Sequence, residues 1–241
     1  MSGPARSPAF AQAQALAGDE EHEARLTEAK GEVTVFTAEE PEGVPGETDM
    51  PLQVGDRLKT GADGNAEVSF SGENTISLRS RSEFTIAAAR RSESELKLVL
   101  GSLLARVQEI IGNGNFRVRT PTAVASVRGT EFGVEVSAGD QDETHVGVFD
   151  EGKVEVSGES GPAEMLISNQ ETRVRKGGRP LPAYQIKRFV QHRKFMRALR
   201  KRAQILRKKW KSIPPEKRMS MRKSALEAAG PVRIQAQVAF A

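Results

Sequence analysis

Short runs of alternating apolar and polar residues recur every eight to twelve residues between residues 31 and 178, with polar turns between them. In "NAEVSFSGEN", for example, Ala66, Val68 and Phe70 share one face before a Gly-Glu-Asn turn. Successive side chains of a strand point to opposite faces, so this pattern predicts strands that each bury one face. Short strands at such regular spacing predict a mainly β fold, either a sandwich or a roll or solenoid. For residues 96–111, a helix is the minor alternative.

Segments of different character flank this β region. Residues 1–30 are polar and Ala-rich, which predicts a disordered leader. Its A-x-A triplets, such as Ala9-Phe10-Ala11, resemble the cleavage end of a secretory signal, although no apolar stretch precedes them. A signal peptide that is truncated in this sequence is one expectation, and a plain disordered leader is the other. Residues 231–241 are expected to form a tail.

The C-terminal segment is strongly basic. Residues 181–241 contain 17 Lys and Arg against two Glu, a net charge of +15; because the whole chain carries +4, residues 1–180 carry −11. Apolar residues at three- and four-residue spacing from Ile186 to Trp210 predict an amphipathic helix, and a shorter helix follows the two prolines at 214 and 215. The sequence therefore predicts a β domain over residues 31–178 and a basic helical hairpin over residues 183–230.

Three interpretations of the basic helix are open. Residues 187–211 hold twelve Lys and Arg and no acid. Such a helix can lie on an anionic membrane with its apolar side chains inserted, or bind the phosphates of a nucleic acid. It can also dock on the acidic β domain, because an apolar helical stripe usually indicates burial. The residues expected to contact an anionic surface are Arg193, Lys194, Arg197, Arg200, Lys201, Arg207, Lys208 and Trp210.

The stretch "TPTAVASVRGTEFGVEV", residues 120–136, joins two predicted strands. Gly129 can adopt a positive φ without steric cost, and Thr130 can bond to nearby backbone as a turn residue. Arg128 can pair with an acid or cap carbonyl groups. The stretch is therefore interpreted as a structural corner in a sheet, and contact between Arg128 and a ligand is the alternative. Gly133 falls on the face opposite Phe132, where a neighbouring group can approach closely.

Several classes of site are not supported by the sequence. The chain has no Cys, which excludes disulfides, Cys-ligated zinc and Cys nucleophiles. The three histidines, His22, His145 and His192, have no metal-ligand spacing, and no G-x-S-x-G motif is present. No apolar run approaches the length of a transmembrane helix. We therefore predict no catalytic residue, no cofactor and no metal ion, which makes an enzyme the weakest functional class.

The order of these features resembles the FecR domain family. The matching stretches are "LQVGDRLKTGADGNAEVSFSGENTISLRSRSEFTI", "GSLLARV", "FRVRTPTAVASVRGTEFGVEV", "VGVFDEGKVEVSG" and "ISNQETRVRKGG", which together span roughly 150 of the 241 residues. The most specific is TP-x-A-x-A-x-V-R-G-T-x-F, whose family-motif residues are Thr120, Pro121, Arg128, Gly129, Thr130 and Phe132. The resemblance implies an extracytoplasmic all-β domain, found in bacterial surface-signalling regulators and in other exported proteins. Those regulators also have a sigma-factor-binding segment and a membrane span, which are not seen in this sequence.

These observations together favour a non-enzymatic, extracytoplasmic FecR-domain protein that acts as a binding or scaffold module of a bacterial envelope, in the periplasm or beyond it. Its expected partner is an unidentified protein or envelope polymer, with peripheral contact to an anionic membrane through the basic helix. One alternative is a soluble sensor component that passes a surface signal to a sigma-factor regulator. A second is a nucleic-acid binder that uses the basic tail, which export would disfavour.

Overall fold

The computed structural model describes residues 24–70, 74–89, 93–108, 115–137 and 143–229. The predicted tail and most of the predicted leader lie outside the described residues. The first strands are β1 (Ala24–Lys30), β2 (Val33–Phe36), β3 (Val44–Pro45), β4 (Pro51–Leu52), β5 (Arg57–Thr60), β6 (Asn65–Ser69), β7 (Thr75–Leu78) and β8 (Glu83–Ala89). They are followed by β9 (Glu93–Val107), β10 (Asn115–Arg119), β11 (Val124–Val127), β12 (Thr130–Val136), β13 (Glu143–Val148), β14 (Lys153–Ser157), β15 (Glu164–Ile167), β16 (Gln170–Arg175) and β17 (Tyr184–Gln185). The described helices are η1 (Val190–His192), α2 (Arg193–Lys211) and α3 (Pro215–Ala229), so the predicted mainly β fold is confirmed.

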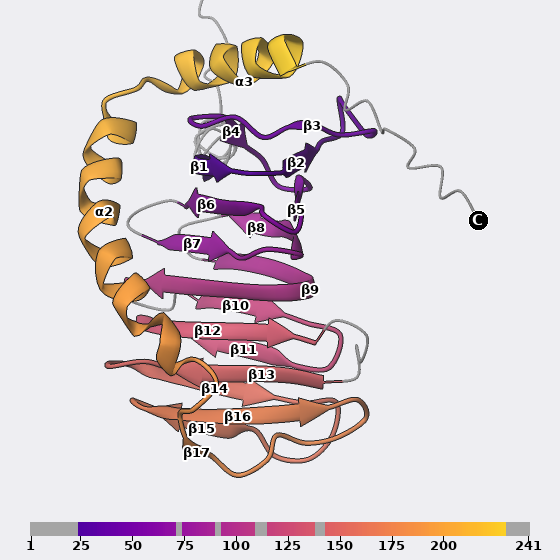
Figure 1. The fold of residues 1–241 in the computed structure, drawn as a ribbon, viewed down its shortest axis with the longest axis vertical. Coiled ribbons are helices and arrows are strands. Elements are labelled where there is room, and N and C mark those ends of the chain that lie inside the picture. Colours follow the sequence, from indigo (N-terminus) through magenta and orange to yellow (C-terminus); the bar gives the residue numbers. More distant parts are fainter. Residues whose placement is uncertain (1–23, 71–73, 90–92, 109–114, 138–142, 230–241) are drawn as a thin grey trace, which may run out of the picture.

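The strands succeed one another along the long axis of the molecule (Figure 1), and they form two layers that pack face to face. We call one layer sheet A, with the order β4-β1-β6-β7-β9-β12-β13-β16-β17, and the other sheet B, with the order β3-β2-β5-β8-β9-β10-β11-β14-β15. The long strand β9 belongs to both layers, because residues 93–100 pair in sheet B and residues 101–107 pair in sheet A. The helix considered for residues 96–111 is therefore wrong for the described part of that range.

The hydrophobic core lies between the two layers. Alternate residues of each strand point inward, so the apolar face seen in the sequence is the buried one. Phe116 from sheet B meets Phe132 from sheet A edge-to-face with ring centroids 6.3 Å apart, and Phe70 lies 6.5 Å from Phe116. Each such buried side chain contributes roughly 1.5–3 kcal/mol through removal of apolar area from water.

Strand β1 corrects the predicted leader. Residues 24–30 pair with β6 in sheet A, although the sequence prediction made them disordered. A register shift between Leu26 and Glu28 interrupts the regular pairing of this strand with β6. The sequence therefore lacks the regular alternation that would have predicted a strand here. Both faces of the strand are also covered, and the outward-facing Arg25 is 1% exposed with its Nη1 3.1 Å from the Asp49 carboxylate.

The two helices cover different parts of the β structure instead of forming the predicted hairpin. Helix α2 runs along the layers and contacts β6 and β9, whereas α3 lies across one end, against β3 and β4 (Figure 1). Helix α2 begins at Arg193, later than the apolar spacing from Ile186 predicted. The reason is that the backbone N–H groups of Lys187 and Arg188 both donate to the carboxylate of Glu171, at 3.1 Å, which fixes a turn there.

Candidate functional site

The segment before and within α2 closes a second apolar cluster on the outer face of sheet A. Phe189 is fully buried there and meets Phe149 edge-to-face at 6.4 Å. A Cβ atom at Gly133 or at Gly147 would lie 2.5 Å from the Phe189 ring, so the ring occupies the space that side chains on β12 and β13 would need. The close neighbour expected at Gly133 is thus Phe189. The cluster consists of Leu104, Phe149, Ile186, Phe189, Met196 and Leu199.

Ion pairs between the basic segment and acids of the β domain surround this cluster. The Arg200 Nε donates to Glu131 at 2.8 Å, and its Nη2 lies 3.1 Å from Glu151. The Arg193 Nη1 donates to Asp150 at 2.8 Å. Two further pairs join Arg202 to Glu67 and Arg188 to Glu135. Of the three interpretations of the basic helix, the structure shows the docked one.

Two of the carboxylates that pair with these arginines are largely removed from solvent. Glu67 and Glu131 are each 3% exposed. Burial raises the pKa of Glu67 above its ordinary value, and the neighbouring Arg202 acts in the opposite direction. The hydrogen bond to Glu131 raises the pKa of Arg200. Removing one partner of such a pair is costly, because the remaining charge stays in a medium that solvates it poorly.

The opposite face of α2 remains basic and exposed. Lys194, Arg197 and Lys201 are exposed at three- and four-residue spacing, and we call them the basic strip. None of the three has an ion pair with a residue that the structure describes, and the neighbouring Ile205 is 71% exposed. Arg193 and Arg200, predicted to contact an external surface, are instead bound to the β domain. The side chains of the other predicted contacts, Arg207, Lys208 and Trp210, lie outside the described residues.

The first part of the family motif forms the turn from β10 to β11. The Thr120 backbone N–H donates to the Ala123 carbonyl at 2.8 Å, and the Ala123 N–H donates to the Thr120 hydroxyl at 2.9 Å. The Thr120 hydroxyl also lies 2.8 Å from that of Thr144 on β13, and Thr122 donates to the same oxygen at 2.7 Å. The exposed Pro121 occupies the tip. These bonds tie sheet B to sheet A.

The second part of the motif is the corner at which the chain passes from β11 in sheet B to β12 in sheet A. Gly129 has a φ of 121°, in the region that favours glycine. The Thr130 hydroxyl donates to the Lys153 carbonyl and accepts from the Lys153 N–H, both at 3.0 Å. Arg128 is exposed, and no hydrogen bond or ion pair joins it to the residues described. The motif therefore forms a structural corner, and the exposed Arg128 side chain makes none of the hydrogen bonds that hold this corner among the described residues.

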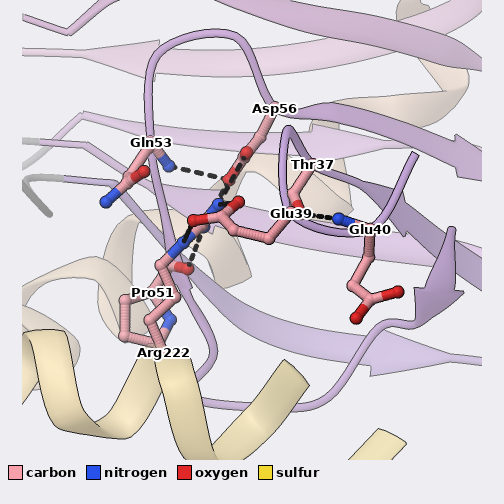
Figure 2. A network of polar contacts seen from close by, with 7 residues as sticks. All are labelled: Thr37, Glu39, Glu40, Pro51, Gln53, Asp56 and Arg222. Atoms are coloured by element: carbon pink, nitrogen blue, oxygen red, sulfur yellow. Dashed lines mark hydrogen bonds and ion pairs between the residues drawn. The ribbon is translucent and has the colours of Figure 1, made fainter. Parts of the chain in front are cut away.

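The end of the β structure is closed by Arg222 of α3, whose side chain meets the loop after β2, the start of β4 and the turn before β5 (Figure 2). Its Nη1 and Nη2 donate to both carboxylate oxygens of Asp56, at 2.6 and 3.0 Å. The same guanidinium donates to the Pro51 carbonyl at 3.0 Å and to Glu39 at 3.0 Å. Asp56 also accepts the Gln53 N–H at 2.8 Å. Burial raises the pKa of Asp56 against the effect of Arg222, whereas the bonds from Arg222 lower that of the more exposed Glu39.

Comparison with known proteins identifies the β structure. Residues 56–155 match the family model described as FecR protein. These residues form a FecR domain. The resemblance expected from the sequence motifs is thus confirmed, over the span from the turn before β5 into β14. The two layers continue past both ends of the match, since β1 to β4 precede it and β15 to β17 follow it.

Two crystal structures, at 1.65 and 2.50 Å resolution, resemble this chain, and both are of a protein from Parabacteroides distasonis proposed to be an anti-sigma factor. For each, the sequence identity is 19% and the TM-score 0.47, and the match covers 55% of this chain. The same match covers 61% of the chain in each of those crystal structures. No curated protein sequence matches the chain significantly.

Within the described ranges, no group of three or more His, Asp or Glu side chains is placed to hold a metal ion. None of the helices described is both long enough and apolar enough to cross a membrane.

His145, on β13 of the FecR domain, gives a prediction for stability against pH. Its pKa is lowered to about 4, mainly by burial and then by Arg188 and Arg173, although Glu143 lies 3.3 Å from Nε2. Because an unfolded histidine has a pKa near 6.5, the unfolded chain binds the proton first as pH falls. The stabilising contribution is therefore full above about pH 6.5 and falls by up to about 3 kcal/mol toward pH 4.

Urea denaturation between about pH 7 and pH 4.5 measures this effect. The variant His145→Gln cannot be protonated, so its stability should depend less on pH than that of the wild type. An identical pH dependence in the two proteins would contradict the assignment to His145.

Several residues that determine the site were not identified from sequence. Phe189 lies within the apolar spacing from Ile186 to Trp210, and Arg222 lies within the basic C-terminal segment, so the sequence pattern distinguishes neither of them. A search for Gly at outward positions on neighbouring strands, such as 133 and 147, would have indicated a bulky ligand or ring above them. No comparable signal marks Arg222, because its partners lie far away in the sequence.

Proposed function

We propose that this protein is a non-enzymatic FecR-domain binding module of the bacterial envelope, which attaches to an anionic surface through the basic strip. The observation that carries the proposal is the division of α2 into two charged faces. Its inward arginines are neutralised by acids of the β domain. Its outward Lys194, Arg197 and Lys201 have no acidic partner among the described residues and remain available.

The physical chemistry of the strip suits a negatively charged surface. A Lys or Arg close to an anionic membrane contributes about 1 kcal/mol of attraction, which falls off within a Debye length. Ile205 is exposed beside the strip and can enter the headgroup region. Because sheet A holds the opposite face of α2, the strip is presented by a rigid element. An ordered helix loses little conformational freedom on binding, which favours affinity.

An extracytoplasmic location is part of the same proposal. The alternative is a soluble sensor component of surface signalling, and the FecR match supports a role related to signalling. The β domain acts as the scaffold, and the strip holds it at the surface where a partner protein is met. A nucleic acid would use the same side chains through its phosphates. Competition by duplex DNA in the assay below separates that alternative from attachment to the envelope.

Charge reversal of the strip tests attachment. The triple variant Lys194→Glu, Arg197→Glu and Lys201→Glu should lower the affinity for vesicles containing about one-third anionic lipid by at least tenfold, measured by co-sedimentation at low salt. The matched control is Lys59→Glu, Lys97→Glu and Lys153→Glu, three exposed positions on sheet B with the same change in net charge. Equal binding by the two triple variants would refute the proposed attachment.

A further inference from the structure

We propose that the corner at Arg128–Thr130 is the mouth of a binding site for a small ligand that carries a carboxylate or a phosphate. A cavity of about 360 Å³ opens at this corner. Its polar lining comes from Arg106 and Gln108 at the end of β9, from Arg128 and Glu131, and from Glu151. The residues of the basic strip are not among its lining, so this site is distinct from the surface proposed above.

The carboxylates of the cavity already have a cationic partner. Arg200 of α2 lies 2.8 Å from Glu131 through Nε and 3.1 Å from Glu151 through Nη2. Glu131 is 3% exposed and lies 3.4 Å from the Nε of Arg106. The two carboxylates of the lining are thus paired with Arg106 and Arg200, and Arg128 is left as the lining cation without an acidic partner among the described residues. An unpaired cation favours an anionic ligand over a cationic one.

Hydrogen-bond donors remain unused in the same place. The Nη1 atom of Arg106 is buried and has no hydrogen-bond partner. Buried polar groups normally have a partner, so this unpaired nitrogen of a residue that lines the cavity is a donor that an external acceptor would satisfy. Arg128 is exposed and has no ion pair with the described residues. Guanidinium groups bind planar oxyanions in a fork geometry, which suits carboxylate and phosphate.

The size and shape of the cavity limit the ligand. Ligand sites typically span about 300–1,000 Å³, so this one fits a single small organic acid or a phosphate-bearing group of similar size. Gly129 and Gly152 are part of the lining, and a Cβ atom at Gly152 would lie 2.6 Å from the Gly129 carbonyl oxygen, so Gly152 lets the two segments of the corner pack closely. The family motif then has two roles, since Thr130 fixes the corner and Arg128 presents a charge at its opening.

Titration of the full-length protein tests the proposal. Succinate and inorganic phosphate are each added at constant ionic strength, with sodium chloride as the reference, while backbone amide NMR signals are recorded. We expect saturable shifts at residues 128–131 and 151–152 with at least one of the two anions. Succinate alone would identify a carboxylate site, and phosphate alone would identify a phosphate site.

A matched pair of variants completes the test. Arg128→Gln should weaken binding about tenfold or more, because a charge-assisted hydrogen bond is lost. Arg179→Gln replaces an exposed arginine that does not line the cavity, and it should bind like the wild type. Because Arg128 is exposed, its variant should keep the wild-type amide spectrum elsewhere. The absence of saturable shifts with both anions, or equal affinities in the two variants, would overturn the proposal.

Discussion

Replacing Arg222 with Met should lower the free energy of unfolding by about 3–5 kcal/mol. Asp56 is 2% exposed, and Arg222 supplies two of its hydrogen bonds, at 2.6 and 3.0 Å. Without the guanidinium, this carboxylate is left buried without its countercharge, and the Pro51 carbonyl loses a donor. The lost attachment also frees α3 from the end of the β structure, so the loss includes part of the apolar contact made by Leu226.

Urea denaturation followed by circular dichroism measures this loss. Lys223→Met is the matched control on the same helix, because Lys223 is exposed and its change should stay within about 0.5 kcal/mol. In the double variant Arg222→Met and Asp56→Asn, both charges are gone and an amide oxygen still accepts the Gln53 N–H, so most of the stability should return. A loss below about 1 kcal/mol in the single variant would contradict the role assigned to Arg222.

A side chain at position 133 should displace α2. In Gly133→Val, the Cβ atom would lie 2.5 Å from the Phe189 ring, and the two added methyl groups extend further into the same space. The ring must leave its site over β12 and β13, which we expect to cost about 3 kcal/mol and to open the segment to proteases. Denaturation and limited proteolysis measure the two effects.

A double-mutant cycle provides the control for this prediction. Phe189→Ala alone removes a buried ring and should cost about 3–5 kcal/mol. With the ring gone, the valine at position 133 has room, so adding Gly133→Val should cost little more. If the two single losses simply add, the steric conflict between position 133 and Phe189 is not the cause.

The part of the fold that follows from local periodicity could be predicted from the sequence. Alternation placed Phe116, Phe132 and their neighbours on inward faces, and the structure buries them. Strand β1 could not be found in this way, because its register shift and its two covered faces remove the alternation. The start of α2 was also missed, since it depends on Glu171, a residue of β16 that accepts two backbone N–H groups.

The candidate site was predictable only in part. The run of basic residues was evident, and helical spacing could have separated the outward Lys194 and Lys201 from the inward Arg200. The partners of the inward arginines could not be predicted, because Arg202 and Glu67 are 135 residues apart. The corner at Arg128 was predicted from turn chemistry. The cavity beside it depends on strands that converge only in three dimensions, which local patterns do not encode.

The contact between Arg222 and Asp56 also sets an order of events during synthesis. The two residues are 166 positions apart, so the ribosome makes Asp56 long before its partner. At a synthesis rate of roughly 5–20 residues per second, Arg222 is added about 8–33 seconds after Asp56. For that interval the first strands exist without the helix that completes their end, and chaperones have access to them. A chain that stopped before residue 200 would contain the whole FecR domain but would lack Arg222 and helix α3 permanently. We expect such a chain to be a substrate for proteolysis.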